Sequence, residues 1–204
     1  MTDSIPVVDA TPGNLPAARA IAATRAWVRR AVIGLNLCPF ARAVDAKDRI
    51  RYVCSDATDA ETLLTILLAE LQHLADADPL LVDTTMLVHP HALTDFADFN
   101  DFLEIADAAV AELGLDGVLQ VASFHPDFQF ADTEPDDITN ATNRSPCPTL
   151  HLLREESVDR AVAAFPEAAT IYERNIETLE RLGPQGWAAL QERWEEDAAA
   201  ETGN

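Results

Sequence analysis

Residues 118–155 decide how the chain is organised: VLQVASFHPDFQF (118–130), then ADTEPDDITNATNRSPCP (131–148), then TLHLLRE (149–155). The first and last parts have the composition of strands, and the polar middle part connects them. A connection of about twenty residues exceeds the ~12–15 residues beyond which structureless loops become uncommon in compact domains. Aromatic residues at its entry and the Asn143-Arg144-Ser145-Pro146 group at its exit indicate order. We therefore expect the functional site in this stretch.

Strand and helix patterns alternate on the N-terminal side of this stretch. The predicted strands are 49–54, 84–89 and 118–124, and the predicted helices are 15–36, 59–75 and 94–114. Strands that alternate with helices of ~15–20 residues form βαβ units, whose neighbouring strands are parallel. The direction of a fourth strand, at 149–153, stays open because the long loop permits either. The pattern predicts an α/β fold with a small, mostly parallel sheet of about four strands packed by helices. A ferredoxin-like α+β fold is the alternative.

The length of 204 residues fits a single domain with short appendages. Proline and glycine without periodicity predict a flexible arm at 1–14, and the α/β domain is expected to span 15–183. Gly183-Pro184 then marks a break before a C-terminal helix and acidic tail at 184–204. The tryptophans of this last segment, Trp187 and Trp194, are expected to dock on the domain.

Charge and composition exclude some classes of partner. The chain has 35 acidic and 14 basic residues, a net charge of -21, and such a chain repels phosphate backbones and anionic membrane surfaces. No run approaches the ~18 apolar residues of a membrane span, and no secretory signal is visible. Three cysteines form a sparse, odd set that is typical of reduced thiols. We expect a cytoplasmic protein, and nothing in the sequence indicates its oligomeric state.

Two of the predicted strands end in the same short pattern, a histidine followed by a proline. One ends in Leu87-Val88-His89-Pro90 and the next in Ser123-Phe124-His125-Pro126. If these strands are parallel, both histidines lie at the carboxyl edge of the sheet, where open α/β sheets bind ligands. Cys54, at the end of the first strand, is a further candidate there. The preference of proline for turns explains the repeated His-Pro pattern equally well.

The main functional hypothesis is an enzyme that acts on a small anionic metabolite. Cys38 is its nucleophile or His125 its acid or base, because a thiol needs a basic neighbour to become a thiolate at neutral pH. Asn143, with Asn140, supplies amide donors, and Arg144 supplies an anion clamp. The structural alternatives are a buried thiol, a histidine hydrogen-bonded at a strand end, and an arginine paired with acids of its own loop.

Two other classes of function stay open. A metal-binding protein would use His89, His91 and His125, since His-x-His at a strand end is a known ligand spacing, although Pro90 favours a turn as much. Loop carboxylates that offer further ligands are Asp132, Asp136 and Asp137. In a non-enzymatic binding module, the long loop itself would be the partner surface.

Three stretches resemble a known family. NLCPFA at 36–41, SFHPDFQFADTEPDDITNATNRSP at 123–146 and HLLRE at 151–155 resemble domain-of-unknown-function family 1415, which occurs in bacteria and plants. The resemblance extends from about Trp27 to Leu182. It implies a self-standing domain, and it assigns no activity, cofactor or catalytic residue.

Overall fold

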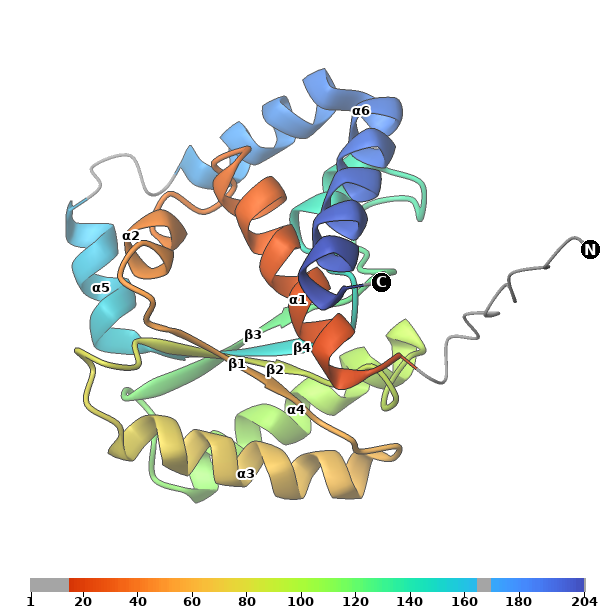
Figure 1. Ribbon diagram of the computed structural model, residues 1–204. Coiled ribbons are helices and arrows are strands. Elements are labelled where there is room, and N and C mark those ends of the chain that lie inside the picture. Colours follow the sequence, from red (N-terminus) through yellow and green to blue (C-terminus); the bar gives the residue numbers. More distant parts are fainter. Residues whose placement is uncertain (1–14, 165–169, 204) are drawn as a thin grey trace, which may run out of the picture.

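The structure, a computed structural model, describes residues 15–164 and 170–203, so the predicted arm at 1–14 lies outside the described residues. One sheet lies between two layers of helices, with α3 and α4 on one face and α1 and α6 on the other (Figure 1). The strands are β1 (Ile50–Cys54), β2 (Thr84–Val88), β3 (Leu119–Phe124) and β4 (Thr149–Arg154). The helices are α1 (Ala17–Trp27), continued by the π-helix η1 (Val28–Ile33), α2 (Ala41–Asp45), α3 (Ala60–Asp76), α4 (Phe96–Glu112), the 3-10 helix η2 (Ile138–Thr142), α5 (Glu155–Ala164) and α6 (Ile171–Thr202).

The sheet is mixed, with the strand order β1-β2-β4-β3. β1 and β2 are parallel, and β4 is antiparallel to both β2 and β3, so β1, β2 and β3 share one direction. The predicted single α/β domain is confirmed. β4, whose direction the sequence left open, lies between β2 and β3 and runs against them. Helices on both faces distinguish the fold from the ferredoxin-like alternative, in which helices gather on one face.

The α3–α4 layer buries the larger apolar cluster. The leucine stripe of α3 and the inner residues of α4 pack on one face of the sheet. Burial of each leucine side chain stabilises the folded state by roughly 1.5–3 kcal/mol relative to an exposed one. Its fully buried members include Leu63, Leu67, Leu71, Leu74, Leu87, Phe99, Ala106, Leu150 and Leu152. Aspartates begin both helices: the Asp59 carboxylate accepts the Thr62 N–H, and the Asp95 carboxylate accepts the Ala97 and Asp98 N–H groups.

The α1–α6 layer is held by tryptophans and by ion pairs. Trp187 and Trp194 are buried 5.3 Å apart between ring centroids, so their predicted docking is confirmed. α6 bends at Gly183, whose backbone angles (φ 67°, ψ 172°) are not helical. Glycine suits this position because residues with a side chain rarely adopt such a conformation. The bend lets residues 184–202 run along α1 (Figure 1). The ion pairs that join the two helices are Arg19–Glu195, Arg25–Glu201 and Arg30–Asp197.

The first helix ends at Asn36, which has a left-handed backbone (φ 58°), whereas Gly34 keeps right-handed helical angles. Within the described ranges, no helix is long and apolar enough to cross a membrane. The domain boundary placed at residues 183 and 184 stays a prediction.

Candidate functional site

The carboxyl ends of β1, β2 and β3 lie at one edge of the sheet, as the repeated His-Pro pattern predicted. His89 follows β2 and His125 follows β3, and both rings lie against Phe99 of α4, at centroid distances of 5.8 and 5.1 Å. Both histidines have no exposed surface. The convergence is therefore confirmed, but the two rings lie in the apolar layer beneath the edge and do not face solvent.

Hydrogen bonds fix the protonation pattern of these rings. The Asp127 N–H donates to Nδ1 of His125 over 3.0 Å, and Nε2 lies 3.2 Å from the Leu93 carbonyl, so His125 is the neutral Nε2–H tautomer. His89 donates from Nδ1 to the Ala92 carbonyl at 3.0 Å. Burial lowers the pKa of His125 and lowers the pKa of His89 to about 4. Both ring nitrogens of His125 are thus paired, whereas Nε2 of His89 is buried without a hydrogen-bond partner among the described residues. Neutral, buried rings of this kind offer little basicity.

The long loop is ordered by its own side chains. Asn140 is fully buried, and its Oδ1 accepts the Phe130 N–H and the Thr133 hydroxyl, at 3.0 and 2.7 Å. Its Nδ2 donates to the Glu134 carbonyl at 2.9 Å. Phe128 packs against Phe96 of α4 with centroids 5.4 Å apart, which anchors the loop entry. The loop is thus a built structure and not a loose connection.

Asn143 and Arg144 lie beside His125 and bind the backbone. The His125 N–H donates to the Asn143 carbonyl at 3.2 Å, and Nδ2 of Asn143 donates to the Ser123 carbonyl at 3.3 Å. Arg144 donates from Nε to the Phe128 carbonyl at 3.1 Å and from Nη2 to the Pro135 carbonyl at 2.6 Å. The Arg144 guanidinium, which the sequence predicted to bind an anion, therefore cross-links parts of the loop. Its hydrogen-bond partners are carbonyl oxygens and not the carboxylates of the loop.

Cys38 belongs to a different neighbourhood. Its N–H donates to the Val32 carbonyl at 3.4 Å, and the adjacent Leu37 carbonyl accepts from Asn175 of α6 at 3.0 Å. Burial raises the pKa of the Cys38 thiol, which opposes thiolate formation. Among the described residues no hydrogen bond or ion pair links Cys38 to His125. The structure brings His125, Asn143 and Arg144 together, and the catalytic roles of all four residues stay predictions.

The histidines do not form the metal site that was the alternative. In residues 15–164 and 170–203, no group of three or more His, Cys, Asp or Glu side chains is arranged to hold a metal ion. His125 spends both ring nitrogens on hydrogen bonds, and His89 points Nδ1 at Ala92. The spacing of His89 and His91 instead follows the turn that begins at Pro90, as the sequence alternative allowed.

A groove of about 510 Å³ opens beside this edge, where the segments after β1 and β2 lead into α3 and α4. Its wall has an apolar part, from Phe102 and Ile105, and a polar part that includes His91. The residues that line it are Thr58, Asp59, Ala60, His91, Leu93, Thr94, Asp95, Asp98, Asp101, Phe102 and Ile105. Nδ1 of His91 is buried and has no hydrogen-bond partner in the described part of the chain. The volume is within the usual range of small-molecule sites.

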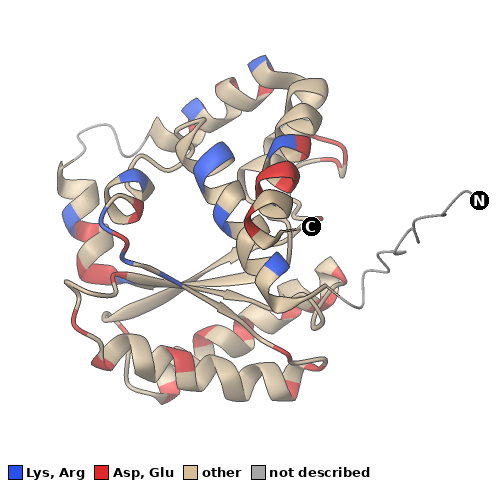
Figure 2. Ribbon diagram, in the orientation of Figure 1, with Lys and Arg blue, Asp and Glu red and all other residues tan. Residues whose placement is uncertain are grey.

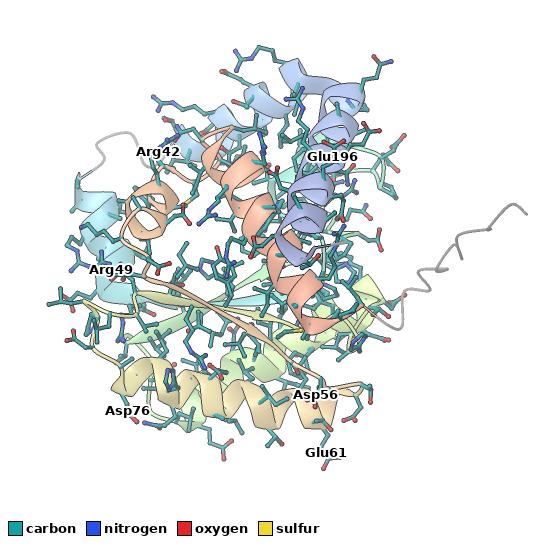
Figure 3. All side chains as sticks on the ribbon, viewed as in Figure 1. Arg42, Arg49, Asp56, Glu61, Asp76 and Glu196 are labelled. Carbon is teal, nitrogen blue, oxygen red and sulfur yellow. The ribbon has the colours of Figure 1, made fainter. Side chains whose placement is uncertain are left out.

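The groove lies in a region without positive charge. Residues 52–143 contain 19 of the 35 acidic residues and none of the 14 basic ones, so they carry -19 of the net charge of -21. Figure 2 shows the result: α3 and α4 carry only red positions, whereas blue positions gather on α1, α2 and α6. In Figure 3 the labelled acids of this region, Asp56, Glu61 and Asp76, extend outward around α3.

The sequence prediction missed the groove because its acids resembled an ordinary solvated helix face. The spacing contained a usable signal: Asp98, Asp101 and Ile105 recur at three and four residues, which places them on one face of α4. The absence of basic residues from 52–143 is a second signal. Together they indicate an acidic surface next to the carboxyl edge.

Comparisons with known proteins give a family and no function. A family model described as "Protein of unknown function (DUF1415)" matches residues 19–189, most of the chain. No curated protein and no solved structure matches the chain.

Proposed function

Because the chain belongs to the DUF1415 family, whose function is unknown, we propose a function from the geometry: the protein binds a small organic amine in the groove between the starts of α3 and α4. The observation that carries this proposal is the composition of the groove. Four aspartates and no basic residue line it, next to an apolar wall. A ligand with a positive charge and a short apolar body matches both parts.

Electrostatic magnitudes favour a cation over an anion in this groove. Each helix start contributes about half a positive charge, which alone would favour an anion. The Asp59 and Asp95 carboxylates accept the N–H groups there and offset this charge. Asp98 and Asp101 make no side-chain hydrogen bond or ion pair with the described residues and stay available to a ligand. The -19 charge of residues 52–143 adds long-range attraction for cations.

His91 supplies the second polar contact. Because Nδ1 is buried without a partner, a ligand donor or acceptor placed in the groove would satisfy it. The ring sits in the segment that leads from β2 to α4, on the same side as Thr94. This position supports an ammonium or hydroxyl group held between His91 and the α4 aspartates.

Calorimetry with paired probes tests the proposal. We expect 1,4-diaminobutane to bind the full chain and succinate, of similar length and opposite charge, to give no signal. The double variant Asp98→Asn and Asp101→Asn should weaken diamine binding by about thirtyfold, since each of the two lost ion pairs near the surface costs on the order of 1 kcal/mol. Asp107→Asn, on α4 but outside the groove lining, is the matched control. Equal binding by the double variant would refute the proposal.

The enzyme hypothesis built on Cys38, His125, Asn143 and Arg144 stays a separate prediction for a small anionic metabolite. The adjacency of His125, Asn143 and Arg144 supports it, and the raised pKa of the Cys38 thiol counts against it. Alkylation with iodoacetamide at neutral pH measures the nucleophile directly. A Cys38 that reacts more slowly than free cysteine would eliminate the covalent version.

A further inference from the structure

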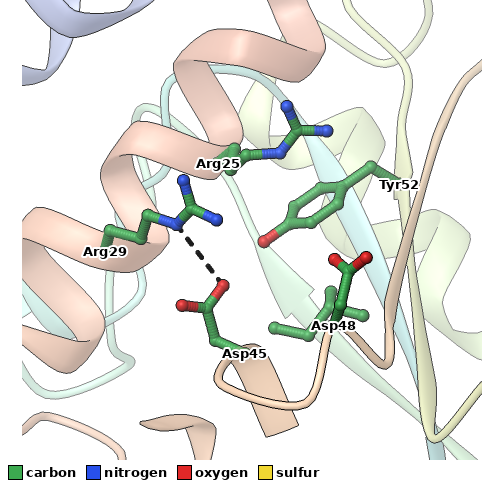
Figure 4. Close-up of a pocket in the computed structure, with 6 residues that line it drawn as sticks. Arg25, Arg29, Asp45, Asp48 and Tyr52 are labelled. Carbon is green, nitrogen blue, oxygen red and sulfur yellow. Dashed lines mark hydrogen bonds and ion pairs between the residues drawn. The ribbon is translucent and has the colours of Figure 1, made fainter.

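A second cavity, of about 110 Å³, lies on the opposite face of the sheet, where α1 crosses the beginning of β1 (Figure 4). It is separate from the groove, shares no residue with it, and takes no part in the function proposed above. A cavity of this size holds several waters or one small ligand. Its lining residues are Arg25, Arg29, Asp45, Asp48, Ile50 and Tyr52.

The Tyr52 hydroxyl is an unusual feature of this cavity. The oxygen is buried and has no hydrogen-bond partner among the residues that the structure describes. Buried hydroxyl groups are nearly always paired, so an unpaired one in a cavity suits a bound ligand as its partner. Burial raises the pKa of Tyr52, which keeps the group a neutral donor at physiological pH.

The charges around the hydroxyl are of both signs. Arg25 lies over the Tyr52 ring, 5.2 Å from its centroid, and also pairs with Glu201. Arg29 holds Asp45 only through a 3.4 Å contact from Nε, which leaves the outer nitrogens of its guanidinium to the cavity. In Figure 4 the two guanidinium groups approach the cavity from α1 and η1, while the Asp45 and Asp48 carboxylates approach from the segment before β1.

We propose that this cavity is a binding site for a small zwitterion, an α-amino acid with a short side chain. Its carboxylate would accept hydrogen bonds from the Tyr52 hydroxyl and the Arg29 guanidinium, whose planar fork suits carboxylate recognition. Its ammonium group would donate to Asp48 and Asp45 on the other side. A simple anion would meet two carboxylates and a simple cation two guanidinium groups, so only a ligand of both charges matches the whole lining.

Isothermal titration calorimetry of the full chain tests this with matched probes. Glycine and alanine carry both charges, acetate carries only the carboxylate, and methylammonium carries only the ammonium group. We expect glycine or alanine to bind at least tenfold more tightly than either half-probe. Equal binding of acetate would replace the zwitterion by a simple anion and overturn the proposal, as would the absence of heat from both amino acids at about 10 mM.

Two conservative variants locate the site. Tyr52→Phe removes only the unpaired hydroxyl, and amino-acid binding should fall by about tenfold; Tyr172→Phe, at the half-exposed tyrosine of α6, is the control and should bind as the parent does. Asp48 has φ 54°, a left-handed angle that asparagine also tolerates, so Asp48→Asn removes the charge and keeps the backbone. Its binding should fall similarly, with an unchanged circular dichroism spectrum. Binding that survives both substitutions would overturn the proposal.

Discussion

The two faces of the sheet use charge in opposite ways. On one face, α3 and α4 pack leucine and phenylalanine inward and turn unpaired acids to solvent around the groove. On the other face, α1 and α6 join through arginine–carboxylate pairs, and the interior holds Tyr52 and His151 among its aromatic residues. The α3–α4 layer therefore has a leucine-rich core, with the His89 and His125 rings at the carboxyl edge of the sheet, and a charged exterior. In the α1–α6 layer, polar and apolar side chains share the interior, and ion pairs neutralise charge on the exterior. The two proposed ligands match this difference: a cation for the groove beside the acidic layer, and a zwitterion for the cavity in the mixed layer.

The largest expected effect is a loss of unfolding free energy when the core of the α3–α4 layer is changed. Leu67→Ala removes a fully buried side chain from the centre of the α3 stripe, and a cavity of this kind costs about 3 kcal/mol of unfolding free energy. Urea denaturation at pH 7 measures it. Leu80→Ala, at an exposed leucine, is the control and should change stability little. A cost below about 1 kcal/mol for Leu67→Ala would mean that the α3–α4 layer is not the main core.

The next effect is a loss of stability at acidic pH, which compares one histidine from each layer, His89 and His151. Burial lowers the pKa of both His89 and His151 to about 4 in the folded protein, whereas the unfolded chain protonates near 6.5. Stability is therefore intact above pH 6.5 and falls as the pH drops toward 4, by roughly 2 kcal/mol per histidine at pH 5. Urea unfolding at pH 7 and pH 5 measures the loss.

Substitution separates the two histidines. His151→Gln keeps a donor for Thr84, which His151 contacts at 2.6 Å through Nε2, and should reduce the pH-dependent loss by about half. Thr65→Ser, at an exposed threonine of α3, changes no titrating group and is the control. If His151→Gln behaves like the control, the acid sensitivity arises elsewhere.

A smaller effect is expected at the start of α4. Asp95→Ala removes the carboxylate that accepts two backbone N–H groups, and the loss of such a cap costs about 1 kcal/mol. Asp95→Asn keeps an accepting oxygen and should recover most of the loss. Thermal unfolding by circular dichroism compares the two variants, and an equal loss in both would show that charge, not hydrogen bonding, stabilises the helix start.

The smallest effect is expected on the paired surface of the other layer. Arg30→Gln breaks an exposed ion pair with Asp197, and such pairs contribute little in water. The unfolding midpoint should stay within experimental error of the parent at physiological salt. A clear drop would show that the α1–α6 contact depends on its ion pairs more than on Trp187 and Trp194.

The sequence predicted those parts of the molecule that depend on local periodicity. The stripe of Leu63, Leu67 and Leu71 identifies α3, and the ends of β2 and β3 place His89 and His125 at one edge. Side-chain partners were out of reach, because Arg144 meets carbonyls nine and sixteen residues away only through the fold of the loop. The partnerless Tyr52 hydroxyl was equally invisible, since it depends on what α1 and α2 leave uncovered.

The position of β4 has a consequence for how the chain acquires its structure. β4 is the last strand in the sequence, yet it separates β2 from β3, which precede it. During synthesis, the first three strands therefore cannot join into one sheet until residues 149–154 emerge, and one edge of β2 waits unpaired. Premature chain ends before residue 149 should yield aggregation-prone fragments, because an open strand edge pairs readily with another copy. β1 and β2 can pair earlier, but the order of strands makes completion of the sheet a late event that requires β4.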